Sequence, residues 1–306
     1  MQRTKQSVKN ASFAIIAQII QQVLRVVVRI AFIRVLGEYL GINAVFSDIL
    51  VALQLVEIGI GPAIAFSLYK PLSCNDTEKV KSLMKLFKKA YRIIGTVILI
   101  AGVLFMPFYG FFINDIENQN MASLNIVYLI FIFDTAISYF YSYYRTLLIS
   151  DQKKYLDTAI HTGVLLVISI LQIVLIYVTR NYYVYLAIQV LGTISTNFIA
   201  SRVAMKQYPY LKEKNVEKLD GETFGEIKKN VFAMIFHKIG GVIRDATDNL
   251  LISKYIGLAL SGIYSNYFMI TKALNTLISQ VFSAVLSSVR KFTCNAFWRS
   301  SKRSIL

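Results

Sequence analysis

One apolar run near the amino end limits what this chain can fold into. Residues 11–36 are long enough to cross a bilayer, which takes about 20 apolar residues. The run nevertheless contains Gln18, Gln22, Arg25 and Arg29, which share an arc of about 60° on a helix. An arginine at mid-bilayer costs roughly 2.5–3.5 kcal/mol on insertion scales. The run therefore predicts a membrane helix whose cationic stripe faces a watered cavity lined by protein.

Further apolar runs follow, and together they predict an all-α integral membrane protein with about eight transmembrane helices. The chain is 56% hydrophobic, which is too apolar for a soluble domain of ordinary composition. The predicted spans lie near residues 12–36, 42–68, 92–113, 124–147, 158–178, 183–204, 232–254 and 260–289. Lysine and arginine gather in alternate gaps: segments 69–92 and 202–231 hold seven each, whereas 37–41 holds none. By the positive-inside rule, both termini are expected to be cytoplasmic.

A weak internal repeat predicts how the chain is divided. The segment Gln21–Arg25 aligns with Gly240–Arg244 at an offset of 219 residues, and the next helix follows at an offset of 218. Such repeats occur in transporters built from two homologous bundles. The expected parts are a complete six-helix bundle (1–205), a cytoplasmic linker (206–230), the first two helices of a second bundle (231–289) and an atypical basic tail like that of a frameshift (290–306).

Polar stripes on several spans predict a shared cavity. Its substrate-binding residues would be cationic, because the guanidinium fork matches phosphate; they are Arg25, Arg29, Arg244 and Lys272. The cavity acids would balance this charge or carry a coupling proton or sodium ion; they are Glu57, Asp134 and Asp248. The alternative is that these charges pair with one another and only hold helices together. Interruption of the second span predicts a hinge at Gly59, Gly61 and Pro62.

Other segments bear on the surroundings of this cavity. Residues Asn75–Arg92 predict a basic amphipathic helix with Asn75 as N-cap, which would lie on the anionic inner leaflet or form a solvated connector. Segments 95–113 and 163–178 are nearly free of polar residues and are expected to face lipid. The sequence contains no catalytic constellation, metal-ligand cluster or glycine-rich phosphate loop. We therefore expect no enzyme activity, no metal, no cofactor and no nucleic-acid partner.

Several segments in order resemble a known family. They are LGEYLGINAVFSDIL (36–50), VEIGIGPAIAFSLYKPL (56–72), SYYRTLLISDQKKY (142–155) and HKIGGVIRDATDNLLISKYIG (237–257). These segments look like the Wzx-type polysaccharide flippases of the multidrug/oligosaccharidyl-lipid/polysaccharide exporter superfamily, over about residues 5–289.

The resemblance implies two six-helix bundles around a central cavity in the bacterial plasma membrane. It implies that undecaprenyl-diphosphate-linked oligosaccharide moves from the inner to the outer leaflet by alternating access. Arg25 and Arg244 match the family positions that hold the diphosphate. Family members continue for several helices past the eighth, so the resemblance predicts a truncated chain that could have lost transport.

Three other functions stay open at this point. One is a drug/cation antiporter of the same superfamily, against which the pair Arg25 and Arg29 argues. Another is a membrane polymerase or ligase acting on the same lipid carrier, against which the short outer loops argue. The last is a non-transporting membrane subunit that works with other polysaccharide-assembly proteins. The expected partners are the lipid-linked oligosaccharide and the bilayer.

Overall fold

The computed structural model describes residues 2–57, 59–113, 121–213, 216–217, 219–276 and 278–279, with side chains undescribed in 2–12, 55–56, 121–122 and 235–246. The helices are α1 (Gln2–Leu36), α2 (Leu40–Leu53), α3 (Ile60–Ser73), α4 (Thr77–Phe105), α5 (Met121–Ser150), α6 (Lys154–Thr179), α7 (Tyr182–Gln207) and α8 (Gly221–Tyr255). Helical residues 258–276 follow α8. Short 3₁₀ helices are η1 (Gly37–Tyr39), η2 (Gln54–Glu57), η3 (Met106–Phe112) and η5 (Pro209–Lys212). Since these ranges contain no strand, the predicted all-α class is confirmed.

Four helical segments in the described part are long and apolar enough to cross a membrane. They are Thr77–Phe112, Ser123–Ser150, Lys154–Thr179 and Tyr182–Gln207. Their large apolar side chains are partly exposed, as lipid-facing residues are; Ile100 on α4 and Val174 on α6 are each 52% exposed. These helices support an all-α membrane protein, while the number of eight spans stays a prediction.

The second predicted span is divided into two helices. Both α2 and α3 have 14 residues, about 21 Å, which is shorter than a hydrocarbon core of about 30 Å. They are separated at Gly59, whose φ is +84° and whose added Cβ would lie 2.8 Å from the Val231 carbonyl oxygen. Pro62 follows in the first turn of α3, where a missing N–H breaks no helical hydrogen bond. The predicted interruption is present, and its hinge motion stays a prediction.

The basic segment before the third span is not a separate helix. It forms the first half of α4, which runs without a break from Thr77 to Phe105. The predicted N-cap is wrong by one residue: Asp76 Oδ1 accepts a hydrogen bond from the Lys79 amide at 3.0 Å. Asn75 has a φ of +56° and belongs to the preceding turn. The cationic turns are therefore continuous with a membrane-spanning helix.

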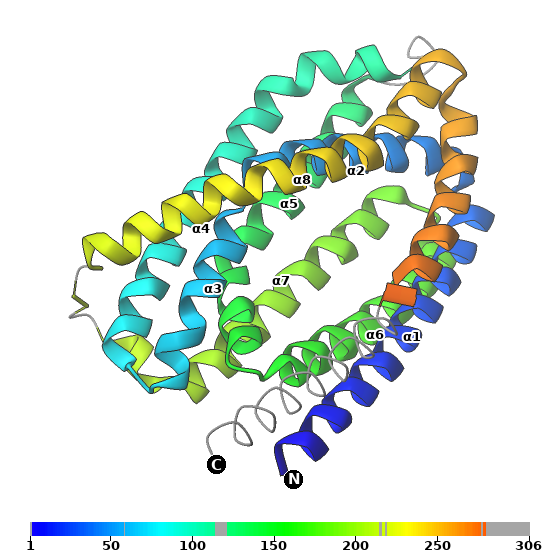
Figure 1. Ribbon diagram of the computed structural model, residues 1–306. Helices are drawn as coiled ribbons and strands as arrows, with labels where there is room; N and C mark the ends of the chain where they lie inside the picture. Colours follow the sequence, from blue (N-terminus) through cyan, green and yellow to red (C-terminus); the bar gives the residue numbers. More distant parts are fainter. Residues whose placement is uncertain are drawn as a thin grey trace, which may run out of the picture.

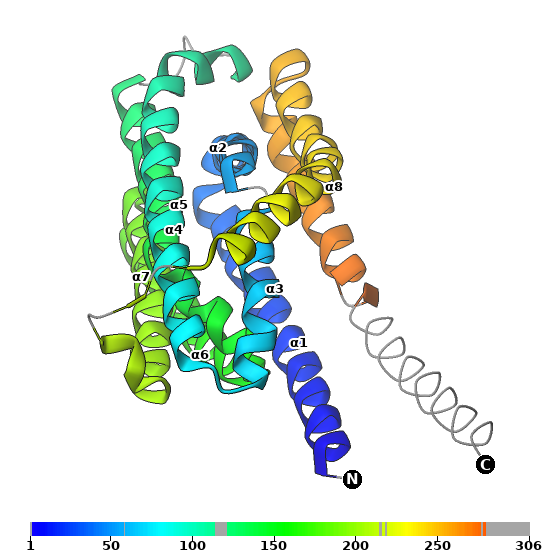
Figure 2. The ribbon, with the colours of Figure 1, turned by 60° about the vertical axis from the view of Figure 1, so that its left-hand side comes forward.

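The contacts between helices fall into two groups (Figures 1 and 2). One group joins α1 to α6, α6 to α7, α7 to α5 and α5 to α4. In the other group, α8 crosses α2 and α3. The segments near the ends of the chain are thereby connected: an added Cβ on Gly41 would lie 2.1 Å from the Leu258 carbonyl oxygen, so only glycine permits this close approach.

The internal repeat has a structural counterpart. Helices α1 and α8 each contain 35 residues, and α8 begins and ends 219 residues after α1. Each is followed by a short turn and a second helix, which begins at Leu40 in one case and at residue 258 in the other. These offsets equal those of the sequence alignment. The repeat is therefore a helix–turn–helix unit, while the predicted division of the chain at 205, 230 and 289 stays a prediction.

We expect Phe46→Ala to reduce stability strongly. Phe46 is fully buried on α2, with ring centroids 5.3 Å from Tyr109 and 5.1 Å from Tyr128. Removing a packed ring leaves a cavity that costs about 3–5 kcal/mol. Thermal unfolding in detergent measures the loss. The matched control is Phe133→Ala, because Phe133 is 47% exposed; equal destabilisation by both variants would contradict the assignment of this core.

Candidate functional site

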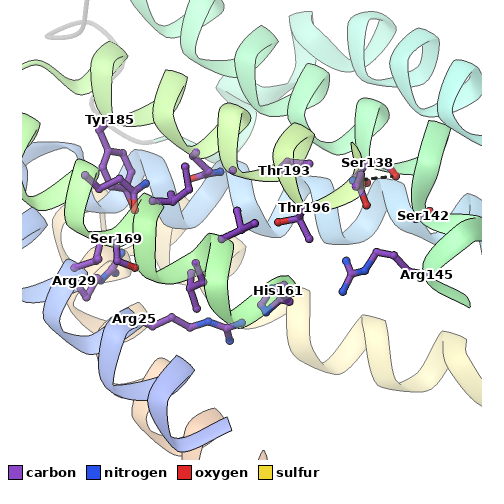
Figure 3. A pocket seen from close by; sticks show the side chains of 18 of the residues that line it. Arg25, Arg29, Ser138, Ser142, Arg145, His161, Ser169, Tyr185, Thr193 and Thr196 are labelled. Carbon is purple, nitrogen blue, oxygen red and sulfur yellow. Dashed lines mark hydrogen bonds between the residues drawn. The ribbon is translucent and has the colours of Figure 1, made fainter. Parts of the chain in front are cut away.

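A cavity of about 570 Å³ lies between α1, α5, α6 and α7 (Figure 3). Its wall is mixed: arginine, histidine, hydroxyl and amide side chains alternate with aliphatic ones. The lining residues are Arg25, Val28 and Arg29 of α1; Ser138, Ser142 and Arg145 of α5; His161, Val164, Leu165, Ile168, Ser169 and Gln172 of α6; Tyr185, Gln189, Gly192, Thr193, Thr196 and Asn197 of α7; and Met269. The predicted cationic stripe of α1 therefore faces a protein-lined cavity.

Arg29 connects α1 to the last described helix. Its Nε donates to Asn266 Oδ1 at 2.6 Å, and its Nη2 donates to Ser265 Oγ at 2.6 Å. The guanidinium carbon also lies 6.0 Å from the centre of the Phe32 ring. Both acceptors are neutral, so the positive charge of Arg29 stays uncompensated by these contacts.

Arg25 makes no hydrogen bond or ion pair with any described side chain. Figure 3 shows its side chain extended along the cavity, with the guanidinium group directed toward His161. No described residue therefore occupies its N–H donors, and guanidinium suits a phosphate or carboxylate group because it can donate two parallel hydrogen bonds. His161 lies beside it in the cavity wall.

Arg145 is the third arginine of the wall, and it is neutralised. Its Nε donates to Asp157 Oδ1 at 2.5 Å, and its Nη2 donates to Asp157 Oδ2 at 3.2 Å. Asp157 is only 8% exposed. This two-point pair ties α5 to α6 across the turn at 151–153. The charge available to an anionic ligand therefore comes from Arg25 and Arg29.

The three predicted cavity acids lie outside the lining. Asp134 is nearest: its Oδ2 accepts from the amide nitrogen of the lining residue Gln189 at 3.1 Å, and its Oδ1 is buried without a partner among described residues. Glu57 accepts from the Tyr91 hydroxyl at 2.8 Å. Asp248 accepts from the Tyr264 hydroxyl at 2.8 Å. Asp134 can thus influence the cavity through Gln189, whereas the other two acids hold helices together.

Among the remaining predicted site residues, those with described side chains also lie outside the cavity lining. Lys272 is exposed, lies 5.5 Å from the centre of the Phe268 ring and does not line the cavity. The side chain of Arg244 falls outside the described residues. The predicted hinge residues Gly59, Gly61 and Pro62 lie at the junction of α2 and α3, away from the lining.

The polar wall on α6 and α7 was not foreseen. On α7, Gln189, Thr193, Thr196 and Asn197 line the cavity. Their spacing of four, seven and eight residues places them on one helical face, so the signal was present in the sequence. On α6, Ser169 and Gln172 are buried in the segment expected to face lipid. Two isolated polar residues on an apolar helix are too weak a pattern to predict a buried face.

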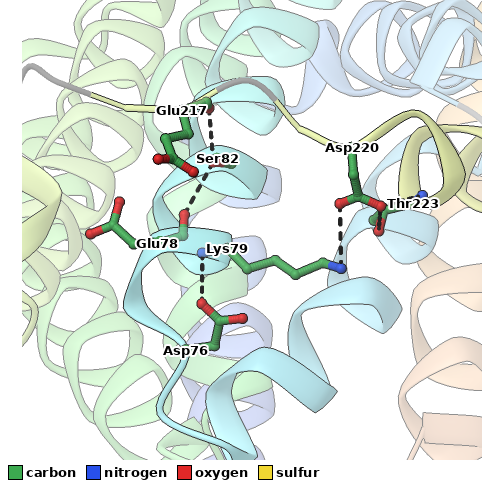
Figure 4. A network of polar contacts seen from close by, with 7 residues as sticks. All are labelled: Asp76, Glu78, Lys79, Ser82, Glu217, Asp220 and Thr223. Atoms are coloured by element: carbon green, nitrogen blue, oxygen red, sulfur yellow. Dashed lines mark hydrogen bonds and ion pairs between the residues drawn. The ribbon is translucent and has the colours of Figure 1, made fainter.

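A second polar network joins α4 to the segment before α8 (Figure 4). The Ser82 hydroxyl donates to the Glu217 carbonyl at 2.9 Å, and Lys79 Nζ lies 3.4 Å from Asp220 Oδ1. Asp220 also accepts from the Thr223 hydroxyl at 2.6 Å and from its amide at 2.9 Å, which caps α8. The Thr223 hydrogen bonds, with help from Lys79, lower the pKa of the Asp220 carboxyl to about 2.

We expect this cap to make stability depend on pH. The lowered pKa in the folded state means that Asp220 stabilises the fold above about pH 4, the unfolded value, and that this stabilisation is lost as pH falls toward about 2. Asp220→Asn keeps a capping oxygen but removes the charge, so its unfolding midpoint should change less over this interval. Thermal unfolding of both proteins between pH 5 and pH 2 measures the difference, and parallel curves would contradict it.

We expect Asp157→Asn to destabilise the protein by about 3 kcal/mol, because a half-buried Arg145 would lose its counter-charge. The double variant Arg145→Gln/Asp157→Asn should recover much of the loss, since neither charge then remains. Chemical unfolding in detergent of the single and double variants gives the coupling free energy between Arg145 and Asp157. Additive effects of the two substitutions would show that the pair contributes nothing to α5–α6 packing.

Comparison with known proteins identifies the family. A family model described as polysaccharide biosynthesis protein matches residues 7–287, which is most of the chain. No curated protein and no solved structure matches the chain. Together with the long apolar helices, the match marks a multi-pass membrane protein with a role in polysaccharide synthesis or export. The chain belongs to the polysaccharide biosynthesis protein family.

Proposed function

We propose that this protein is a Wzx-type flippase that moves undecaprenyl-diphosphate-linked oligosaccharide repeat units across the bacterial plasma membrane, with both termini cytoplasmic. The observation that carries the proposal is the guanidinium of Arg25, which has no partner among the described residues, in a cavity of mixed lining between apolar helices. In a protein of a polysaccharide biosynthesis family, the diphosphate of a lipid-linked sugar is an anion that such a guanidinium group would bind.

The cavity suits the two chemical parts of such a headgroup. Arg25 and Arg29 lie one helical turn apart on α1, so their side chains can approach adjacent phosphoryl groups. Hydroxyl and amide side chains on the opposite wall can exchange hydrogen bonds with sugar hydroxyls; they include Gln172, Gln189, Thr193 and Asn197. The prenyl chain would stay in the surrounding lipid, which is more apolar than a wall that contains arginine and amide side chains.

Alternating access requires contacts that exist in only one of two states. The hydrogen bonds from Arg29 to Ser265 and Asn266 join the two repeated units and are suited to this role. An entering diphosphate would compete for the same guanidinium, which would loosen the contact as substrate binds. The break at Gly59 would supply the bending point, and Asp134 is the candidate carrier of a coupling proton or sodium ion.

The alternatives are less well supported. In a drug/cation antiporter, a cationic substrate would meet the uncompensated charges of Arg25 and Arg29. An enzyme would need a nucleophile activated by a base, and among the described residues no hydrogen bond joins a serine or threonine hydroxyl of the wall to His161. A non-transporting subunit of an assembly system would not need a free arginine, and the experiment below separates it from a flippase.

We expect Arg25→Ala to abolish surface polysaccharide in a strain that depends on this gene, with normal protein levels. Loss of two charge-assisted hydrogen bonds, each worth about 1.5–3 kcal/mol, weakens binding by at least about a hundredfold. Arg25→Lys keeps the charge without the fork and should retain partial output. Arg34→Ala, on an exposed part of the same helix outside the cavity, is the matched control.

The lipid-linked intermediates that accumulate distinguish a flippase from an assembly subunit. A blocked flippase leaves single repeat units on the lipid carrier in the inner leaflet, which radiolabelling of extracted lipids detects. Normal polysaccharide output from Arg25→Ala would exclude the cavity as the headgroup site. Loss of output without accumulation of single repeat units would instead favour a role as an assembly subunit.

A further inference from the structure

A second hollow, of about 550 Å³, lies outside the cavity and is lined by α4 together with Glu217 and Leu219. Four cationic side chains stand around it: Lys85, Lys88, Lys89 and Arg92. Their spacing of three, four and seven residues places them on one face of the helix. All four are exposed. We call this hollow the α4 groove.

The cations of the α4 groove are uncompensated in the described part of the chain. Earlier on the same helix, Lys79 pairs with Asp220, and Lys81 Nζ lies 2.5 Å from Glu213 Oε2. By contrast, Lys85 makes only a 3.4 Å contact with the Val216 carbonyl oxygen. The other three groove cations have no hydrogen bond or ion pair among the described residues.

One carboxylate, that of Glu217, stands beside the groove, so the positive charges outnumber the negative ones. Like charges one turn apart on a helix repel, and this repulsion is relieved when an anion binds between them. The α4 groove is therefore a site that an anionic group would stabilise.

The floor and continuation of the groove are apolar. Leu86, Ile93 and Leu219 line it, and Ile93 is 54% exposed. Beyond Arg92 the same face of α4 carries exposed aliphatic side chains as far as Leu104, which is 69% exposed. Twelve residues of helix span about 18 Å, close to the depth of one leaflet of hydrocarbon, about 15 Å. A cationic turn is thus followed by an apolar face of the length of an acyl chain.

We propose that the α4 groove binds the headgroup of an anionic phospholipid, whose acyl chains lie along the apolar face from Ile93 to Leu104. The phosphate lies among Lys88, Lys89 and Arg92. Charges in direct contact are much closer than the Debye length, so dissolved salt weakens their attraction little. A soluble anion would leave the apolar floor and the exposed aliphatic face uncovered, whereas a phospholipid covers both. Because Glu217 and Leu219 belong to the segment before α8, the bound lipid also lies beside the polar contacts that join this segment to α4.

Native mass spectrometry of the purified, delipidated full chain tests this site. Titration with phosphatidylglycerol and with phosphatidylcholine of the same acyl chains should show at least a tenfold preference for the anionic lipid. Lys88→Gln/Lys89→Gln/Arg92→Gln should lose that preference, while Lys88→Arg/Lys89→Arg keeps it. The matched control, Lys206→Gln/Lys228→Gln/Lys229→Gln, removes the same charge from exposed positions outside the groove and should behave as the wild type.

Each other result would overturn the proposal. Equal affinity of the wild type for both lipids would show that charge does not select the ligand. An equal loss in the control variant would show a general effect of net charge. Binding of soluble glycerol phosphate as tight as that of phosphatidylglycerol would show that the acyl chains contribute nothing. Circular dichroism of every variant confirms that the helices are retained.

Discussion

The cost of holding arginine inside an apolar helix determines much of this structure. Arg25 and Arg29 lie among aliphatic residues of α1, and a guanidinium group in hydrocarbon is strongly unfavourable. Packing α1 against α6 lowers this cost, because both arginines then line a cavity shared with hydroxyl and amide groups of α6 and α7 rather than facing lipid. The polar residues of α6 and α7 and the arginines of α1 thus share one cavity.

Arg29 also joins the two repeated units. Arg29 donates to Ser265 and Asn266, which stand at the positions equivalent to Ser47 and Asp48 in the alignment of the repeat. Close approach of backbones at Gly41 and Leu258 supports this contact. Leu250 and Leu258 also pack against the aromatic core around Phe46, so apolar contacts join the two units beside these hydrogen bonds. The alternating access proposed above would have to break the hydrogen bonds from Arg29 while the core around Phe46 stays packed.

Periodicity and charge predicted the fold class, the break near Gly59 and the cationic stripe of α1, since each depends on neighbours within one or two helical turns. The N-cap at Asp76 and the continuity of α4 were missed because the basic composition of 75–92 suggested a surface segment. A lysine-rich turn is compatible with a spanning helix when its charged groups remain at the interface. Charge composition alone could not distinguish these arrangements.

The sequence by itself determined which residues are polar in an apolar helix, and therefore that Arg25 and Arg29 must face protein or water. Only the tertiary structure decided which charges stay free. Arg145 is neutralised by Asp157 because a tight turn brings α5 and α6 together, whereas Arg25 has no carboxylate near it in the described part of the chain. Lys272 lies outside the cavity although its helix carries a polar stripe. Pairing depends on distances of a few ångströms between helices, and no helical period encodes those distances.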